Sequence, residues 1–192
     1  MRELPQLLSE RLELRPFSSL DSAAVEQLAG AWEVADTTLT IPHPYPIGSA
    51  LGWISTHAAM WDAGVSLPLA ICDRTARSQL VGAISLKISP AHSHGEIGYW
   101  IGVSNWGKGY ATEAGRSLTA YAFSDLGLHR VHGRHFTRNA ASGRVLQKIG
   151  MKFEGVQRDA YLRWGLFEDV AAYAILVSEW EADVAQLRGR AI

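Results

Sequence analysis

The sequence predicts a single α/β domain built on a mixed sheet with helices on both faces. Its 192 residues, 47% of them hydrophobic, can bury one substantial core. Strand and helix patterns follow one another in the order strands, helix, strand, helix, strands, which is typical of such a sheet. Neither a linker nor an internal repeat divides the chain. We therefore expect one domain over residues 1–192, with its core at about 11–180 and a C-terminal tail at 181–192.

The N-terminal third combines one short strand with two helices. Leu12 and Leu14 alternate with charged residues before Pro16, a pattern that predicts a strand stopped by the proline. Gly64 is expected to end the second helix. The expected elements are a strand at 11–15, a helix at about 21–32, a proline-rich irregular segment at 37–48 and a helix at about 49–63.

The remainder of the chain predicts most of the sheet and its other helices. Three successive apolar runs separated by polar turns indicate an antiparallel meander. Ala111, Ala114, Leu118 and Ala122 then recur at spacings of three or four, so this helix packs one face on the sheet. The expected elements are strands at 67–72, 80–88 and 96–103, a helix from about 111, a strand at about 130–137, a helix at 139–150, and strands near 151–158 and 170–177.

The most informative stretch runs from Asn105 to Ala114 and joins a strand to a helix with little side-chain bulk. Gly107 and Gly109 let main-chain N–H groups approach a ligand closely. The helix that begins near Ala111 adds unpaired amides and the positive end of its dipole. An anion site is therefore predicted, of the kind that binds nucleoside triphosphates, dinucleotides or the pyrophosphate of coenzyme A.

Three phosphate-binding patterns can be compared with this loop. The stretch 102–109 almost matches a Walker A motif, but Gly109 replaces the Ser or Thr that binds magnesium, which argues against a nucleotide hydrolase. The dinucleotide fingerprint lacks its third glycine at Thr112, and no acidic ribose ligand follows at the expected distance. What remains is the pattern Arg/Gln-x-x-Gly-x-Gly/Ala, which Gly109 and Ala111 match and Trp106 does not.

Further pieces of the chain extend the pattern beyond the loop. They are Arg11 to Pro16, Glu96 to Ile101, Asn139 to Ser142 with Gly150 and Met151, and Asp159 to Arg163 onward to Trp180. With the loop, these pieces cover nearly the whole chain, which resembles the GCN5-related N-acetyltransferase superfamily. Within it, the chain is similar to the branch of the ribosomal-protein acetyltransferases RimJ and RimL. Trp106 stands where the superfamily has Arg or Gln, a substitution that this branch commonly shows.

The resemblance implies the fold in more detail and the identity of the co-substrate. It implies a mostly antiparallel sheet in which a central parallel strand pair, here the strands that end near Val103 and Thr137, splays apart to admit acetyl-CoA. Unpaired main-chain groups at Ile101 and Val103 would then pair with the amides of pantetheine. The residues expected to bind acetyl-CoA are Ile101, Val103, Trp106, Gly107, Lys108, Gly109, Tyr110, Ala111, Thr112, Asn139 and Ser142.

Two side chains are candidates for the chemistry of acetyl transfer, which needs a neutral amine and a proton for the departing thiolate. Glu96 matches the acidic position that the family carries before Gly-Tyr-Trp, so it is the candidate base; the alternative is a surface glutamate at a strand end. Asn139 is suited to cap its helix, which places Ser142 in the first turn. The resemblance implies that Asn139 binds pantetheine and that Ser142 places a hydroxyl near sulfur; the alternative is that Asn139 only caps the helix and Ser142 is only a polar residue in its first turn.

Glu113 lies in the first turn of the helix that begins near Ala111. It is expected to interact favourably with the helix dipole or to make a structural hydrogen bond, rather than to act in catalysis.

The acceptor pocket is expected in irregular segments that the family uses for this purpose. His43, Tyr45 and Arg163 lie in such segments, and Trp100 is expected to join them. Tyr99 and Trp100 alternate on their strand, so one should fill the core while the other lines the cleft, and the periodicity leaves open which does.

The expected activity is acetyl transfer to a primary amine by direct attack in a ternary complex, without a covalent enzyme intermediate. Family analogy ranks a protein N-terminal amine, such as that of a ribosomal protein, ahead of a small amine or an antibiotic. The rival interpretation is a coenzyme-A-binding module without turnover, and the presence of Glu96 together with Ser142 argues against it.

Composition narrows the partners. A net charge of −1 gives no general reason to bind nucleic acid or an anionic membrane, and no apolar stretch approaches the length of a membrane helix, so a cytoplasmic protein is expected. The basic stretch 129–153 either faces the cofactor's phosphates or is a solvated surface.

The single Cys72 is expected to be buried. The pairs formed by His92 with His94 and His132 with His135 lack a third ligand, so no metal is expected. The residues leave open whether the protein forms a homodimer.

Overall fold

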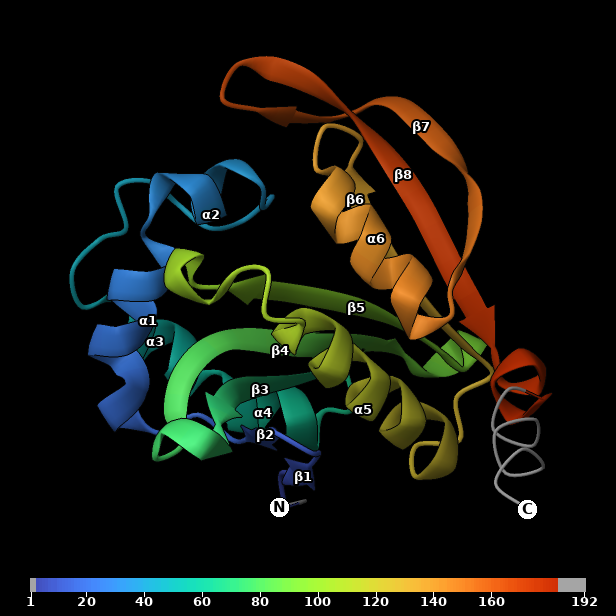
Figure 1. Ribbon diagram of the computed structural model, residues 1–192, viewed down its shortest axis with the longest axis horizontal. Coiled ribbons are helices and arrows are strands. Elements are labelled where there is room, and N and C mark those ends of the chain that lie inside the picture. The colour runs from blue at the N-terminus through green and yellow to red at the C-terminus, as the bar shows by residue number, and fades with distance from the viewer. Residues whose placement is uncertain (1–2, 183–192) are drawn as a thin grey trace.

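The computed structural model describes residues 3–182 and centres on an eight-stranded sheet in the order β1-β2-β3-β4-β5-β6-β8-β7 (Figure 1). Every neighbouring pair is antiparallel except β5 and β6, which are parallel. The predicted mixed, mostly antiparallel sheet is therefore confirmed. The strands are β1 (Leu7–Leu8), β2 (Leu12–Arg15), β3 (Ser66–Asp73), β4 (Gln79–Ser89), β5 (His94–Ile101), β6 (Arg130–Phe136), β7 (Lys152–Arg163) and β8 (Leu166–Leu176).

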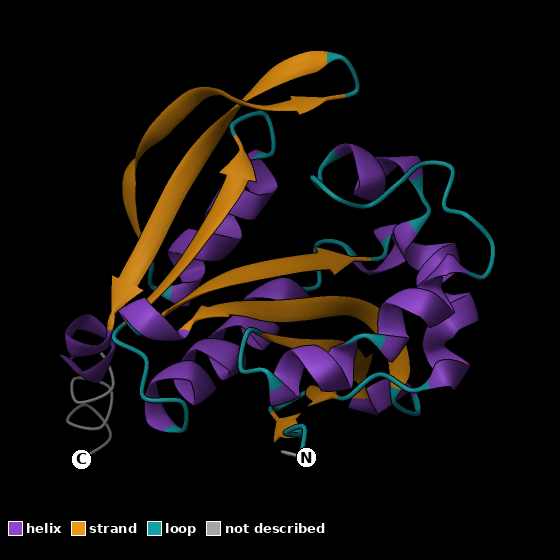
Figure 2. Ribbon diagram, turned by 180° about the vertical axis from the view of Figure 1, so that it is seen from behind, coloured by secondary structure: helices purple, strands orange, loops and turns teal. Residues whose placement is uncertain are grey.

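Helices cover both faces of the sheet, as predicted. Those in the described residues are α1 (Ser22–Ala29), α2 (Trp32–Asp36), α3 (Ser49–Ser55), α4 (His57–Asp62), α5 (Tyr110–Ser124) and α6 (Ala140–Ile149). Seen together, the two opposite views place α5 and α6 on one face and α3 and α4 on the other (Figures 1 and 2). No helix in residues 3–182 has both the length and the apolar character that a membrane span requires.

Several element boundaries differ from the sequence-based expectation. The helix expected at about 49–63 is divided at Thr56 into α3 and α4, and the strand expected at 170–177 begins at Leu166. The helix expected at 21–32 is interrupted between α1 and α2, because Ala31 adopts extended backbone angles (φ −60°, ψ 135°) that cannot continue a helix. The strand expected at 96–103 ends at Ile101, and Val103 begins a 3₁₀ turn. β7 continues to Arg163, beyond the expected end at 158, because it pairs with the long β8. Residues 183–192 of the expected tail lie outside the described part of the chain.

Successive residues of β3 pack alternately into two hydrophobic clusters, one on each face of the sheet. Leu69 and Ile71 pack in the larger apolar cluster, which includes residues of α5. Ala70 and Cys72, one residue out of phase, pack in a second cluster with Val25 of α1. Burial raises the pKa of the Cys72 thiol to about 11. The cysteine is thus buried, as expected, and is a poor nucleophile at neutral pH.

The parallel pair β5 and β6 is joined at one end and open at the other. Pairing runs from His94 with Arg130 to Ile97 with Gly133, and no later pair of the two strands is matched in the described structure. Beyond that point the strands diverge (Figure 1). α6 packs closely against α5 at Gly115, where an added Cβ would lie 2.3 Å from Cδ1 of Ile149. The two helices therefore come together on one side of the opening. The expected splayed pair is therefore present.

One buried group makes the stability of this fold sensitive to acid. His57 of α4 is 4% exposed, and its ring lies 4.4 Å from the ring of Trp53 and 5.4 Å from that of Phe17, measured between centroids. Neither ring nitrogen has a hydrogen-bond partner in the described residues. Burial therefore disfavours the charged imidazolium and lowers the pKa of His57 from 6.5 to about 4.

We predict that the free energy of unfolding falls as the pH drops from 6.5 toward 4. Because the pKa of His57 is lower in the folded than in the unfolded state, the unfolded chain binds the proton first, and up to about 3 kcal/mol is lost across this window. Urea unfolding at neutral pH and near pH 5 measures the loss. His57→Phe should lose less stability than the wild type between these two conditions, whereas His92→Gln, at an exposed position, should behave as the wild type. An equal loss in His57→Phe and wild type would contradict the assignment.

Candidate active site

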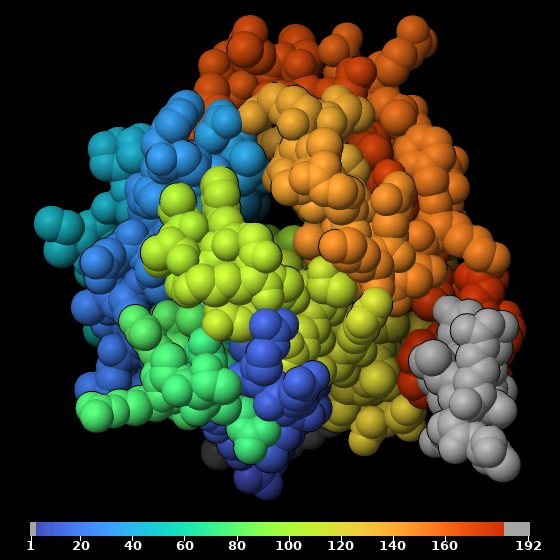
Figure 3. Space-filling view, viewed as in Figure 1, coloured from blue at the N-terminus to red at the C-terminus, as the bar shows by residue number. Residues whose placement is uncertain are grey.

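A cavity of about 870 Å³ occupies the opening between β5 and β6. The space-filling view shows it as a hollow between the yellow-green segment around 105–112 and the orange α6 (Figure 3). Its walls also include residues of β4, the irregular segment after α2, and Tyr161 of β7. The segment expected to select an acceptor, and the loop expected to bind an anion, therefore line one cavity.

The loop 105–112 presents main-chain N–H groups rather than side chains. Gly107 and Gly109 have φ angles of 75° and 81°, which L-residues rarely adopt. Within residues 3–182, no protein acceptor binds the N–H groups from Gly107 to Thr112. A Cβ added at Gly107 would meet no protein atom within 4 Å, so it would project into open space beside these donors. Free amides at a helix N-terminus favour a bound anion.

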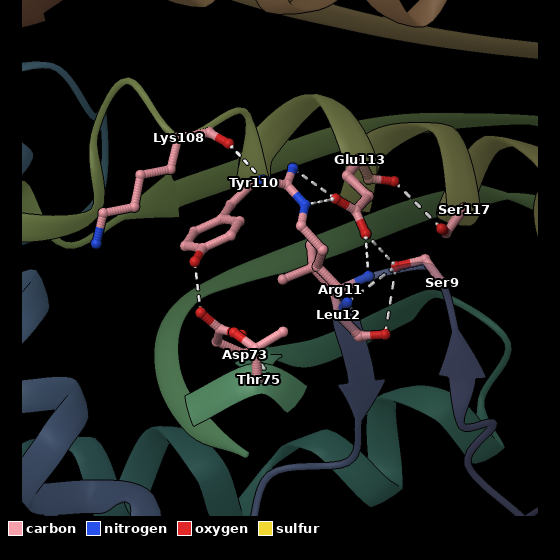
Figure 4. A network of polar contacts seen from close by, with 9 residues as sticks. All are labelled: Ser9, Arg11, Leu12, Asp73, Thr75, Lys108, Tyr110, Glu113 and Ser117. Carbon is pink, nitrogen blue, oxygen red and sulfur yellow. Dashed lines mark hydrogen bonds and ion pairs between the residues drawn. The ribbon is translucent and has the colours of Figure 1, made fainter. Parts of the chain in front are cut away.

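A network of polar contacts fastens this loop from the side of the N-terminal strands (Figure 4). The Glu113 carboxylate accepts hydrogen bonds of 2.8 Å from Ser9 Oγ, from the Arg11 main-chain N–H and from Arg11 Nε. Arg11 also donates to the Lys108 carbonyl oxygen at 3.0 Å. These hydrogen bonds keep the pKa of Glu113 below its usual value in spite of desolvation, which acts in the opposite direction. Glu113 is thus a structural anchor, one of the two roles that the sequence suggested.

Tyr110 anchors the same turn from below (Figure 4). Its hydroxyl donates to the carboxylate of Asp73, which also accepts from the main-chain N–H and hydroxyl of Thr75 at 2.8 and 2.6 Å. The hydrogen bonds from Thr75 and Tyr110 lower the pKa of Asp73. The hydroxyl of Tyr110 therefore has a partner within the protein, and only its main-chain N–H remains available to a ligand at the loop.

The free edge of β5 includes Ile101, as expected, but Tyr99 takes the place of the expected Val103. The Gly102 N–H donates to the Val81 carbonyl oxygen at 2.9 Å, and hydrogen bonding alternates along an antiparallel pair. It follows that Tyr99 and Ile101 direct their main-chain groups toward the gap. The expected Val103 does not do so, because it has left the strand and its carbonyl accepts the Trp106 N–H. The Ile101 carbonyl oxygen already accepts Nε1–H of Trp106 at 2.6 Å, which ties the loop to the strand.

The first turn of α6 faces β5 across the opening. Oδ1 of Asn139 accepts the Ser142 N–H at 3.2 Å, so Asn139 caps the helix as predicted. The hydroxyl of Ser142 lies 2.8 Å from the phenol oxygen of Tyr99. All three side chains line the cavity. A hydroxyl pair therefore spans the gap between β5 and α6.

Glu96 lies where the two strands begin to separate. Arg134 donates from Nε to Oε1 at 2.9 Å and from a terminal nitrogen to Oε2 at 3.0 Å, a two-point ion pair. The other terminal nitrogen donates to the hydroxyl of Tyr161 at 2.6 Å. The side chain of Glu96 is 26% exposed, and it lines the cavity with both partners.

The structure brings most, but not all, of the expected site residues to the cavity. Those that line it are Glu96, Trp100, Ile101, Trp106, Gly107, Gly109, Tyr110, Ala111, Thr112, Asn139, Ser142 and Tyr45. Those outside the lining are Val103, Lys108, His43 and Arg163. Lys108 instead donates to Oδ1 of Asn105 at 2.9 Å.

His43 and Arg163 support a wall of the cavity from outside. Nδ1 of His43 lies 2.9 Å from the Gly30 carbonyl oxygen. Arg163 donates to the carbonyl oxygens of Ala35 and Ile41, and its guanidinium lies 3.9 Å from the ring centroid of Trp164. Both residues therefore brace the segment after α2.

Tyr99, Arg134 and Tyr161 belong to the site although sequence reasoning did not select them. Tyr99 and Trp100 were expected to divide between core and cleft, but both line the cavity because it reaches around the free edge of β5. In the sequence, Arg134 is one of several basic residues in the stretch 129–153, and nothing there pairs it with Glu96. Its partner depends on the register of β5 with β6, which the sequence pattern does not show.

Known proteins share this sequence pattern and architecture. Residues 11–152 match the family model described as an acetyltransferase (GNAT) domain. The uncharacterized N-acetyltransferase YoaA of Bacillus subtilis (strain 168) is 32% identical over 173 residues, which cover 90% of this chain and 97% of that protein. The ribosomal-protein-serine acetyltransferase of Escherichia coli (strain K12) is 29% identical over 100 residues, which cover 52% of this chain and 56% of that protein.

A solved structure supports the same assignment. Mycobacterium smegmatis RimJ in complex with CoA-disulfide matches with a TM-score of 0.79 and 25% identity, covering 88% of this chain and 83% of that chain. The family model extends over both the loop 105–112 and α6. The chain therefore belongs to the GNAT superfamily of N-acetyltransferases and, within it, to the RimJ/RimL-like branch.

Proposed function

We propose that the protein transfers the acetyl group of acetyl-CoA to a protein N-terminal amine, by direct attack within a ternary complex. The observation that carries this proposal is the row of free N–H groups from Gly107 to Thr112 at the mouth of the opening that also holds Glu96 and Ser142. An anion-binding loop thus lies in one cavity with a candidate base and a candidate hydroxyl donor.

The chemistry of the loop fits the pyrophosphate of acetyl-CoA. Its donors are main-chain amides at the start of α5, where the helix dipole favours negative charge. The main-chain groups of Tyr99 and Ile101 at the edge of β5 would pair with the pantetheine amides, and Asn139 would contact the same arm. When bound, acetyl-CoA supplies an acetyl group activated as a thioester.

The cavity residues then divide the acyl transfer between them. The amine nitrogen attacks the thioester carbonyl carbon, and Glu96 accepts the proton that the nitrogen loses, directly or through a water. A carboxylate has about four acceptor sites, so the two-point contact with Arg134 leaves capacity for this role. As the carbon–sulfur bond breaks, the hydroxyl of Ser142 donates a hydrogen bond to the departing thiolate. An amide and the free thiol of coenzyme A are the products.

The charges in the cavity favour an acceptor with a single amine. Among the described residues that line it, Glu96 is the one carboxylate, and Arg134 already pairs with it. A polyamine would bring further ammonium groups that need carboxylate partners when they lose water. The segment after α2 contributes threonines and apolar side chains at this side, which suit the neutral start of a polypeptide.

We predict that peptides with a free N-terminus are acetylated with a kcat/KM on the order of tenfold or more above that of spermidine. The measurement is thiol release from acetyl-CoA with a panel of peptides, polyamines and aminoglycosides. The same peptides with a blocked N-terminus and a free lysine serve as controls. A preference for spermidine, or for the lysine side chain, would reject the proposed acceptor class.

We predict that Gly107→Ala raises the KM for acetyl-CoA by about tenfold or more, because the new methyl group projects beside the free amides and the backbone prefers another φ. Gly64→Ala is the matched control: Gly64 has a φ of 70° after α4, and an added Cβ meets nothing within 4 Å. The control should lose comparable thermal stability and keep its KM. Isothermal titration with coenzyme A checks the loss of binding directly.

We predict that Glu96→Gln lowers kcat by about 10² or more, the usual effect of removing a general base. The glutamine keeps hydrogen-bond capacity toward Arg134 but cannot accept a proton. The pH profile of kcat is the decisive measurement, since the loss of a proton acceptor should change how the rate depends on pH. An unchanged kcat and profile would assign Glu96 to the ion pair alone.

A further inference from the structure

We propose that Tyr99 is a positioning residue of the transfer site, whose phenol hydroxyl holds the hydroxyl of Ser142 with its hydrogen directed toward the leaving sulfur. This inference rests on the proposed function, and it adds a role for the side chain of Tyr99, of which the acetyl transfer described above uses only the main chain. It follows from the geometry of two hydroxyl groups on opposite sides of the opening.

Tyr99 lies on the part of β5 that has no partner strand. Pairing with β6 ends at Ile97, so the Tyr99 side chain can cross the gap to the first turn of α6. There, its hydroxyl oxygen lies 2.8 Å from Oγ of Ser142 and 3.2 Å from the Ser142 carbonyl oxygen. Both side chains line the cavity in which the thioester would lie.

The number of hydrogens available selects one arrangement of this pair. Each hydroxyl has a single hydrogen. If the phenol donates to Oγ, the Ser142 hydrogen remains free for a group in the cavity; if the phenol donates to the carbonyl, Ser142 donates back and has none left. The Oγ distance is typical of an O–H···O hydrogen bond, whereas the carbonyl distance is beyond the usual range. The carbonyl also accepts within α6, as helical carbonyls do. The first arrangement is therefore favoured.

Tyr99 acts as a hydrogen-bond donor rather than a source of protons. Burial raises the pKa of Tyr99 to about 12, in spite of its hydrogen bond to Ser142. An ordinary thiol has a pKa of about 8.5, so a proton would not pass from the phenol to the thiolate. The phenol stays neutral throughout the range in which such an enzyme works, and the hydrogen bond to Ser142 persists. The proton that finally neutralises the thiolate comes from solvent.

The first test is a double-mutant cycle on the steady-state rate. Tyr99→Phe keeps the ring and should lower kcat about tenfold, with the KM for acetyl-CoA nearly unchanged. In the Ser142→Ala background the same substitution should have almost no further effect, because the hydroxyl that it positions is gone. The ratio of wild-type to Tyr99→Phe rates should stay constant between pH 6 and 9. Tyr161→Phe is the matched control: it removes another phenol of the cavity, and its effect should be the same in both backgrounds.

The second test does not depend on acetyl transfer. The ultraviolet absorbance of the thiolate gives the pKa of the thiol of bound coenzyme A, which a hydrogen bond from Ser142 should lower relative to free coenzyme A. Tyr99→Phe and Ser142→Ala should each raise this pKa by up to about one unit, and the double variant should raise it no further. Additive effects, or no effect of Tyr99→Phe, would overturn the inference.

The two tests separate this inference from the proposed function. Normal shifts of the thiol pKa without acetylation of any amine would reject the proposed acceptor but leave the role of Tyr99 intact. Full activity in Tyr99→Phe would leave the proposed function intact and reject the role of Tyr99. Failure of coenzyme A to bind the wild type would reject both.

Discussion

The separation of β5 from β6 after Ile97 and Gly133 is the constraint on which the rest of the site depends. Neighbouring strands normally satisfy each other's main-chain groups, and a buried group left without a partner is costly. Here the groups of Tyr99 and Ile101 face a cavity instead of a strand. The fold therefore presents a ready strand edge that an amide-containing ligand can complete. Without the separation there would be neither a cavity nor a place for the first turn of α6 to face β5.

The loop beside this opening is held in place before any ligand binds. Glu113 and Arg11 fasten the start of α5 to the N-terminal strands, Tyr110 fastens it to Asp73, and Trp106 fastens the loop to the end of β5. These contacts use side chains and carbonyl oxygens, so they leave the N–H groups of the loop free. The conformational entropy of ordering the loop is lost on folding rather than on binding, which favours affinity for the anion.

The ion pair of Glu96 with Arg134 arises from the same strand geometry. Glu96 is matched with His132, so Arg134, two residues further along β6, lies diagonally across the pair on the same face. The carboxylate is therefore placed where the strands begin to separate, and its charge is balanced. The cavity lining also includes Arg144 and Lys148, so cationic side chains outnumber the single carboxylate there, and in the proposed function this disfavours strongly cationic acceptors. In the proposed function, Glu96 would therefore take part in both proton transfer and the choice of acceptor, because the described lining holds no second carboxylate.

The sequence by itself determined the local features of this protein: the alternation of β3, the cap at Asn139 and the glycines at 107 and 109. These depend on periodicity and on backbone preferences, which neighbouring residues set. The resemblance to a family added the splayed strand pair and the identity of the co-substrate. Only the tertiary structure decided that Tyr99 meets Ser142, that Arg134 meets Glu96, and that Arg163 braces a wall rather than lining the cavity. It also replaced Val103 by Tyr99 at the strand edge. Such contacts depend on strand register and on the point at which two strands part, and both are properties of residues that are distant in the sequence.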